Sequence, residues 1–379
     1  MIHLVYPHAQ RISCPDAIGR HLTERLKEMG YEVRNYDWDD PRSIHPGPND
    51  ILLGHPHPFP GTIFRNSIRN LGWKKKIIMS PYNHGDIYQV SFLDPIIKQC
   101  DIYLAITGNF WFENFQNSIY AHWKPKMVHL DLAVDRYEFP VLKNFFNPQG
   151  ERKFLYIGHT APCKNTGYLS KIARSLSNFH FGWIGSGKTI PGFTWHGFLD
   201  FSQKESLDLV AQYDFLITTG KADSNPATIL EAMSWGLIPV CTPESGYKNY
   251  KGIINIPLND VEGAVKTLKW LQECPEDTLR HLQALNWQLL DQHFNWNRFA
   301  KQVAEAIEQE QQFSLEKPRP SSQILIYFGM VFSPYSYLRP RNLLIYLARK
   351  SKILSLLLTF LRKIKKKVKR TFPPIQHMF

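Results

Sequence analysis

The stretch from Gly220 to Thr242, GKADSNPATILEAMSWGLIPVCT, constrains the fold more than any other part of the chain. An apolar run at 213–219 precedes it and has the length of a buried strand. Pro226 stands where helices tend to begin, apolar residues recur at helical spacing over 227–235, and Gly236 is a typical helix end. A second apolar run then indicates another buried strand. The stretch therefore predicts a β-α-β unit whose loop and helix N-terminus favour an anionic ligand.

Two carboxylates belong to this unit. Asp223 lies in the predicted loop, and Glu231 lies inside the predicted helix between apolar neighbours. A carboxylate in such surroundings needs polar partners, and the hydroxyl groups of a sugar or a ribose are suitable donors. The unit is therefore a candidate site for a ligand that carries such hydroxyls.

With these residues, the segment resembles the acid-x7-acid motif of retaining glycosyltransferases of the GT-B type (glycosyltransferase family 4, or "glycosyl transferases group 1"). That motif usually ends E-A-M-A-x-G-x-P-V, and this chain keeps Glu231, Ala232, Met233, Gly236, Pro239 and Val240. Asp223 departs from the customary Glu and reaches one methylene less far. The alternative interpretation is an ordinary crossover in some other α/β protein.

The resemblance also implies roles for residues outside the motif. His84, in the loop at 80–86, corresponds to the family histidine that lies near the donor sugar; alternatively it packs or caps locally. Lys164 corresponds to a lysine that reaches the donor diphosphate; alternatively it is a solvated surface lysine. His159 stands where Arg is usual, which would weaken one phosphate contact and make it pH-dependent.

The implied site residues form two groups. His84 and Asp223 are the expected catalytic residues. The expected donor-binding residues are His159, Lys164, Asn225, Pro226, Ala227, Thr228 and Glu231. In this scheme Glu231 holds the ribose hydroxyls and Asp223 the hydroxyls of the transferred sugar, while Lys164 and the helix N-terminus meet the charge of the leaving diphosphate. Neither a metal ion nor another cofactor is expected.

Strands and helices alternate along most of the chain, which predicts an α/β protein, and the resemblance implies two Rossmann-like domains facing a cleft. Residues 1–145 form the expected acceptor-side domain, with a helix over 18–29 and a strand over 127–130. Residues 146–313 form the expected nucleotide-sugar-binding domain with a cross-over helix. Residues 314–379 form a basic amphipathic extension.

Candidate acceptor-side residues follow two strands of the first domain. Arg11 lies in a loop that lacks the family's glycine-rich turn, where it either replaces part of a phosphate cradle or is a solvated surface residue. His55 and His57 lie in a proline-rich loop. Their spacing allows a metal site, an acceptor-pocket wall or simply a rigid loop, and no Cys or carboxylate partner stands nearby in the sequence.

Charge and cysteine content narrow the classes of partner. The formal net charge of +12 is concentrated after Ser314, where fourteen Lys and Arg accompany one acid, Glu316. The body of the chain is nearly neutral, which argues against nucleic acid as a partner. The 5 cysteines show no paired spacing, which favours a reducing cytosol. Because the N-terminus leads directly into a predicted strand, no secretory signal is expected.

The basic extension favours contact with a membrane surface. Its apolar run at 324–332 is too short to span a bilayer, and basic residues interrupt the apolar clusters of 342–370. Such a composition suits an interfacial helix on anionic headgroups; a disordered tail or a helix docked on a protein partner are the alternatives. We therefore expect a cytoplasmic protein that is peripheral on the inner face of the membrane.

Together these features predict an enzyme that moves a sugar from a nucleotide-sugar donor to an acceptor with retention of configuration. The extension points to a glycan or a lipid-linked glycan as the acceptor. Two alternatives stay open: an epimerase-like enzyme on the same scaffold, and a non-catalytic binding subunit. The departures at Asp223 and His159 favour the latter.

Overall fold

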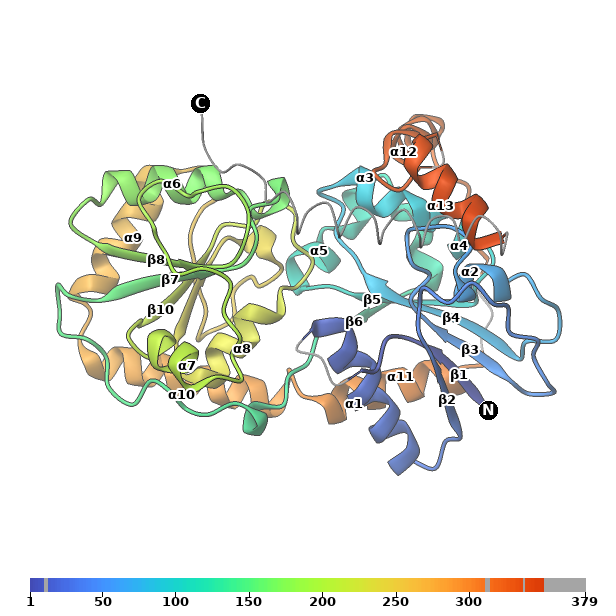
Figure 1. Ribbon diagram of the computed structural model, residues 1–379, viewed down its shortest axis with the longest axis horizontal. Helices are drawn as coiled ribbons and strands as arrows, with labels where there is room; N and C mark the ends of the chain where they lie inside the picture. Colours follow the sequence, from blue (N-terminus) through green and yellow to red (C-terminus); the bar gives the residue numbers. More distant parts are fainter. Residues whose placement is uncertain (10–12, 311–313, 337, 351–379) are drawn as a thin grey trace, which may run out of the picture.

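The computed structural model describes residues 1–9, 13–310, 314–336 and 338–350, so Arg11 and the basic run at 362–370 lie outside the described residues. The chain forms two α/β units, each built on a six-stranded sheet (Figure 1). Every described strand pair is parallel. The expected class, two Rossmann-like units facing each other, is confirmed.

The N-terminal sheet has the strand order β2-β1-β3-β4-β5-β6. Its central strands are buried on both faces, as expected of a parallel sheet covered by helices. The order reverses direction at β1, and ligands of such sheets gather beyond the carboxyl ends of the strands. The strands are β1 (Ile2–Val5), β2 (Val33–Tyr36), β3 (Ile51–Gly54), β4 (Lys75–Pro81), β5 (Ile102–Ile106) and β6 (Met127–Leu130).

The C-terminal sheet has the order β12-β11-β10-β7-β8-β9. Strands β10 and β11 flank the motif helix, and all of their residues are buried. The strands are β7 (Lys153–Ile157), β8 (His180–Ile184), β9 (Thr194–Trp195), β10 (Phe215–Thr218), β11 (Ile238–Cys241) and β12 (Ile254–Asn255).

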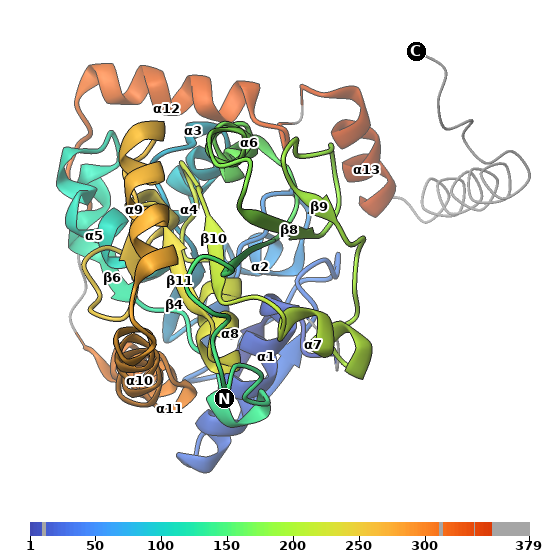
Figure 2. The ribbon, with the colours of Figure 1, turned by 90° about the vertical axis from the view of Figure 1, so that its left-hand side faces the viewer.

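Helices cover both sheets (Figure 2). Those of the first unit are α1 (Cys14–Glu28), α2 (Ile63–Ser67), α3 (Ile87–Val90), α4 (Asp94–Ile97) and α5 (Asn109–Glu113). The second unit contains α6 (Thr166–Ser175), α7 (Lys204–Val210), α8 (Ala227–Trp235), α9 (Val261–Glu273) and α10 (Glu276–Gln292). Three more follow: α11 (Trp296–Glu308), α12 (Pro320–Phe332) and α13 (Pro340–Lys350).

Helix α1 begins four residues before the predicted start at Ile18. Ser13 caps it, because its hydroxyl accepts a hydrogen bond from the amide of Asp16 at 3.3 Å, and Pro15 occupies the first turn, where proline is tolerated. The helix therefore presents its N-terminus to the carboxyl end of β1. The sequence prediction considered apolar spacing and overlooked this cap.

The chain passes between the two units twice. On its first crossing, the amides of Leu142 and Lys143 both donate to the carbonyl of Trp235, at 2.9 and 3.0 Å, so the crossing segment is fastened to the C-terminal end of α8. On the return, α11 packs against α1. Asp131, which directly follows β6, pairs with two side chains of this returning segment: its Oδ2 lies 2.8 Å from His293 Nε2 and 3.0 Å from a guanidinium nitrogen of Arg298.

A buried ion pair secures the first crossing to the C-terminal unit. Lys143 Nζ lies 2.7 Å from Asp214 Oδ1, and the two side chains are 3% and 0% exposed. The Asp214 carboxylate also accepts the backbone amides of Asn147 and Lys153, at 2.8 and 2.9 Å. Its removal would leave a buried cation and two partly buried amides without an acceptor.

We expect Asp214→Ala to destabilise the protein by about 3–5 kcal/mol, the range for breaking a buried ion pair. Urea unfolding of the full chain, followed by tryptophan fluorescence, measures this loss. Asp208→Ala is the matched control, because Asp208 pairs with Lys204 on the surface at 2.5 Å, and it should leave the midpoint unchanged. Equal midpoints for the two variants would contradict the assignment.

The C-terminal helices lie on the N-terminal unit. Helix α12 packs against α3 and the 3-10 turn Ser91–Leu93; it lies above the N-terminal unit in Figure 1 and runs along the top of the molecule in Figure 2. Among the described residues, no helix has the length and apolar content needed to cross a bilayer.

Candidate functional site

Helix α8 begins where the sequence predicts and leaves its N-terminus open. Pro226 is the N-cap residue and makes no side-chain capping hydrogen bond. Gly236 ends the helix with a φ of +91°, which explains the glycine at this position. The first amides of an uncapped helix point outward with the positive end of the helix dipole. They are suitable donors for a phosphate group.

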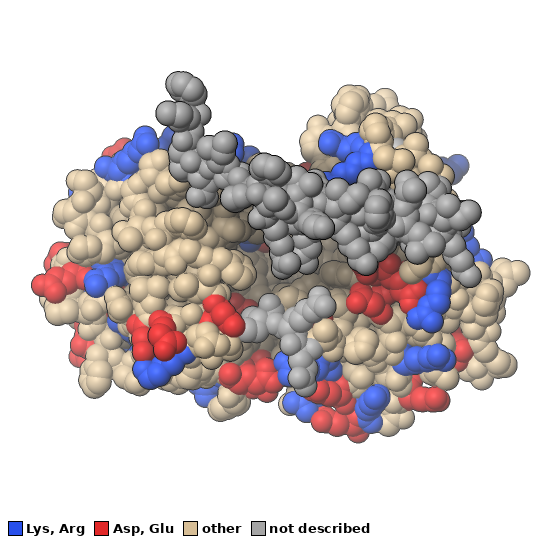
Figure 3. All heavy atoms as spheres, in the orientation of Figure 1, with Lys and Arg blue, Asp and Glu red and all other residues tan. Residues whose placement is uncertain are grey.

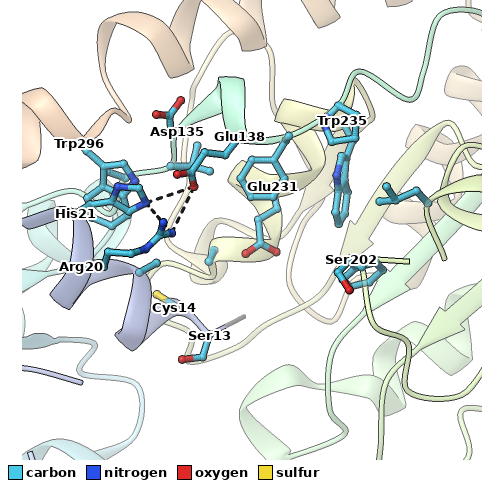
Figure 4. A pocket seen from close by; sticks show the side chains of 18 residues that line it. Ser13, Cys14, Arg20, His21, Asp135, Glu138, Ser202, Glu231, Trp235 and Trp296 are labelled. Carbon is cyan, nitrogen blue, oxygen red and sulfur yellow. Dashed lines mark hydrogen bonds and ion pairs between the residues drawn. The ribbon is translucent and has the colours of Figure 1, made fainter. Parts of the chain in front are cut away.

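Glu231 lies one turn further along α8 and points into a cavity of about 260 Å³ between the two units (Figure 4). The N-terminus of α1 contributes Ser13 and Cys14 to this cavity, and the crossing segment contributes Glu138. Ala227 lines the same space. The cavity therefore draws on both units, as a ligand site between two domains requires.

The Glu231 carboxylate has no hydrogen-bond partner among the residues that the structure describes. Burial raises its pKa to about 7. The pKa of the nearby Cys14 thiol rises to about 12, first because of its own burial and second because of the Glu231 charge. A carboxylate that is largely desolvated and has no protein donor is unfavourable, and a ligand in the cavity that supplies hydroxyl groups would relieve it.

Lys164 and Asp223 form an ion pair beside the start of α8. Their side chains are each 16% exposed, and Lys164 Nζ donates to Asp223 Oδ2. Neither residue lines the Glu231 cavity. The structure thus brings the predicted phosphate-binding lysine and the predicted sugar-binding acid together, while Glu231 lies in a neighbouring space on the same helix.

His159 is exposed and lies near the Lys164–Asp223 pair. Its Nδ1 accepts the amide of Ala161 at 3.2 Å. Burial lowers its pKa, and the positive charge of Lys164 lowers it further. The imidazole is therefore mostly neutral at pH 7 and contributes less to binding an anion than the arginine it replaces.

Residues of the N-terminal unit close over the Asp223 loop. The indole Nε1 of Trp111 donates to the Asp223 carbonyl at 2.6 Å, and the amide of Gly108 donates to the Ser224 carbonyl at 2.8 Å. His84 meets Trp111 edge-on, with ring centroids 4.9 Å apart. His84 and Asp223, distant in sequence, therefore lie on either side of one contact between the units.

Burial lowers the pKa of His84 to about 4, so this imidazole is neutral at physiological pH. Its Nδ1 lies 3.2 Å from the hydroxyl of Tyr82, which leaves Nε2 for another partner. A neutral imidazole exchanges a hydrogen bond with a sugar hydroxyl without carrying a charge into the site.

Two buried side-chain amide atoms at this contact lack hydrogen-bond partners among the described residues. They are Asn83 Oδ1 and Asn225 Nδ2. Asn83 Nδ2 donates a hydrogen bond to Ser224 Oγ at 3.2 Å, and Asn225 Oδ1 accepts one from the Tyr247 hydroxyl at 3.3 Å. Thr228 follows in the first turn of α8 and is half-buried. An unpaired acceptor and an unpaired donor suit a polar ligand better than an apolar one.

His55 and His57 pack around Trp38, with ring centroids 4.9 and 5.3 Å from it. Burial lowers the pKa of His55 to about 3. Within the described part of the chain, no group of three or more His, Cys, Asp or Glu is placed to hold a metal ion. The two histidines belong to an aromatic cluster at the carboxyl end of the first sheet, where their role in acceptor binding stays a prediction.

The sequence prediction missed Asn83, Gly108 and Trp111. The signal for Gly108 was present: it lies two residues after the end of the buried strand β5, at the edge where ligands gather. Asn83 and Trp111 carry no local signal, because their importance depends on the approach of a loop more than a hundred residues away.

Solved structures show what this architecture is, although no protein-family model and no curated protein matches the sequence. Sucrose-phosphate synthase from Thermosynechococcus elongatus is similar with a TM-score of 0.60 and 13% identity, over 80% of this chain and 97% of that one. The chain has the GT-B fold.

Further GT-B structures agree with this assignment. An alpha-glucosyltransferase in complex with UDP-glucose and DNA matches with a TM-score of 0.55 and 12% identity, over 81% of this chain and 98% of that one. HepE from Anabaena, in complex with UDP and glucose, matches with a TM-score of 0.53 and 10% identity, over 81% of this chain and 99% of that one. TarM gives 0.54 and 11%, over 69% of this chain, which spans only 55% of TarM. At such identities the likeness establishes the fold alone.

Proposed function

We propose that this protein is a glycosyltransferase that moves a sugar from a UDP-sugar to an acceptor, with retention of configuration and without a metal ion. The observation that carries the proposal is the Glu231 carboxylate, which is half-buried and has no donor among the described residues, in a cavity between the two units of a GT-B fold. The vicinal hydroxyls of a ribose would supply the missing donors. Structures of the same fold that contain UDP support this choice of nucleotide.

The Lys164–Asp223 pair has a defined part in this mechanism. In the donor-free protein the two charges satisfy each other. When the donor binds, Lys164 turns to the diphosphate and Asp223 is released to accept the hydroxyls of the sugar. The open N-terminus of α8 adds backbone amides, so charge that develops on the leaving UDP meets preorganised donors.

His84 would complete the site from the opposite unit. Its neutral ring lies beside Trp111, which holds the Asp223 loop. In this place it would hydrogen-bond a hydroxyl of the transferred sugar and orient the reacting carbon. The close contact between the units would exclude water that otherwise hydrolyses the donor.

For the acceptor we propose a glycan or a lipid-linked glycan. The near-neutral body of the chain argues against nucleic acid, although one similar structure, an alpha-glucosyltransferase, was solved with DNA. We place the protein in the cytoplasm, at the inner face of the membrane.

A binding protein without transferase activity is the second candidate. Asp223 is shorter than the Glu of the family motif, His159 is not an arginine, and Lys164 is already neutralised by Asp223. These three features would each weaken the hold on a diphosphate. An epimerase-like enzyme on the same scaffold would need the donor and no acceptor.

The full chain, incubated with a panel of nucleotide sugars, separates these functions. We expect one UDP-sugar to raise the melting temperature, and UDP release to accelerate when a glycan or lipid-linked glycan is added. Binding without UDP release would support a binding protein, and conversion of the sugar without an acceptor would support an epimerase. If no nucleotide sugar binds, the proposal is wrong.

A further inference from the structure

Helix α12 is held on the N-terminal unit by one narrow face. Ile326 is buried in the core of that unit. Gly329 faces the turn after α3, where a Cβ atom would lie 2.2 Å from Ser91 Oγ and 2.7 Å from the Ile87 carbonyl oxygen. The glycine thus permits a close approach that fixes which side of α12 faces outward.

The outward side of α12 is apolar and uncovered by the described residues. Ile324 and Tyr327 are 67% and 65% exposed, and the rings of Phe328 and Phe332 pack on each other 4.4 Å apart while remaining about half exposed. Helix α13 adds exposed leucines at 343, 344 and 347. A helix that is apolar all round is usually buried all round, and a contiguous exposed patch marks an interaction surface.

Basic residues frame this patch. Lys317 and Arg319 are exposed immediately before α12, and Arg339 and Arg341 are exposed at the start of α13. Figure 3 shows the lobe over α12 as mostly uncharged, with Lys and Arg at its base. The sequence from 351 to 379 continues with eight Lys and Arg and no acid. Apolar side chains within a basic border match the acyl and headgroup layers of an anionic bilayer.

We propose that the docking face, formed by Ile324, Leu325, Tyr327, Phe328 and Phe332, seats the protein on an anionic lipid bilayer. A protein partner fits less well, because protein interfaces are depleted of lysine, whereas Lys317 lies in this border and the sequence after residue 350 adds six more lysines.

The docking face lies next to the acceptor side of the candidate site. Helix α3, on which α12 rests, directly follows the His84 loop. Phe59, in the loop of His55 and His57, packs edge-on against Tyr335 beyond α12, with centroids 5.2 Å apart. If the proposed transferase function holds, the bilayer then borders the acceptor entrance, and the acceptor is a lipid-linked glycan rather than a soluble one.

Co-sedimentation of the full chain with vesicles tests the docking face. The vesicles contain phosphatidylcholine alone or an equimolar mixture with phosphatidylglycerol. We expect the native protein to bind the anionic vesicles and not the neutral ones, and Ile324→Asp/Phe328→Asp to weaken that binding at least about tenfold. Leu71→Asp is the control, because Leu71 is 93% exposed on the same unit, and it should bind as the native protein does.

Three results would overturn the proposal. The native protein could fail to bind any vesicle, or the double variant could bind as tightly as the control, which would assign binding to the basic segment alone. In a lipid-free solution, sedimentation equilibrium could instead show a dimer that the double variant dissolves, so that a second copy covers the face. UDP binding, measured on the same variants, tests the transferase proposal separately and should not change.

Discussion

Replacing Glu231 by Gln is expected to stabilise the ligand-free protein and to weaken its binding of UDP. The carboxylate is half-buried without a donor among the described residues, and desolvation raises its pKa from 4.5 to about 7. The folded state therefore resists ionisation, and stability falls as the pH rises from 4.5 through 7. Gln removes this penalty. It also removes the charge that strengthens hydrogen bonds from hydroxyl donors, so we expect UDP affinity to fall ten- to hundredfold.

The role of Glu231 can also be tested by measuring the proton that UDP binding should release. A ribose that donates to Glu231 favours the ionised form, so UDP binding should release a proton below about pH 7, and affinity should rise with pH up to that value. Calorimetry in two buffers with different ionisation enthalpies measures the release, which Glu231→Gln should abolish. Glu262→Gln, on the exposed first turn of α9, is the control. Unchanged proton release in Glu231→Gln would remove Glu231 from the ribose site.

Gly108→Ala is expected to lower kcat by about a hundredfold while each unit stays folded. A Cβ atom at Gly108 would lie 1.9 Å from the carbonyl oxygen of Gly246 in the other unit. The backbone of Gly108 has a φ of −79°, which alanine adopts without strain, so the clash acts only between the units. Relieving it forces apart the groups that surround Asp223, and a misplacement of about 1 Å costs on the order of 10²-fold in rate.

Steady-state kinetics with the accepted UDP-sugar measure this effect, and the loss should fall on kcat more than on the KM for the donor. Gly167→Ala is the matched control, since a Cβ atom there, in α6, meets nothing within 4 Å. Should Gly108→Ala keep the native kcat, the closed contact between the units would not belong to the catalytic state.

Local sequence rules predicted much of the fold. The strand over 127–130 and the left-handed helix end at Gly236 follow from apolar runs and from the torsional freedom of glycine, both of which act within a few residues. The start of α1 was placed too late because the hydroxyl of Ser13, and not an apolar repeat, decides it. The packing of α12 on the N-terminal unit depends on the close approach of Gly329 to Ser91, which no local sequence pattern predicts.

The candidate site was less accessible to such rules. The apolar neighbours of Glu231 indicated a carboxylate in need of polar partners, and the structure leaves it half-buried without one among the described residues. The partnership of Lys164 with Asp223 was not anticipated, because the resemblance assigned each of them to a ligand. The contact of Trp111 with the Asp223 loop spans the boundary between the units, so it depends on how the two units pack against each other.

The two ends of helix α8 contact different parts of the protein. Its open N-terminus and Glu231 face the expected donor, while at its far end the carbonyl of Trp235 holds the crossing segment through the amides of Leu142 and Lys143. A nine-residue helix is a rigid rod of about 13 Å. A shift imposed at one end is therefore transmitted to the other, and if the proposed function holds, we expect donor binding at Glu231 to be linked to the position of the crossing segment between the two units.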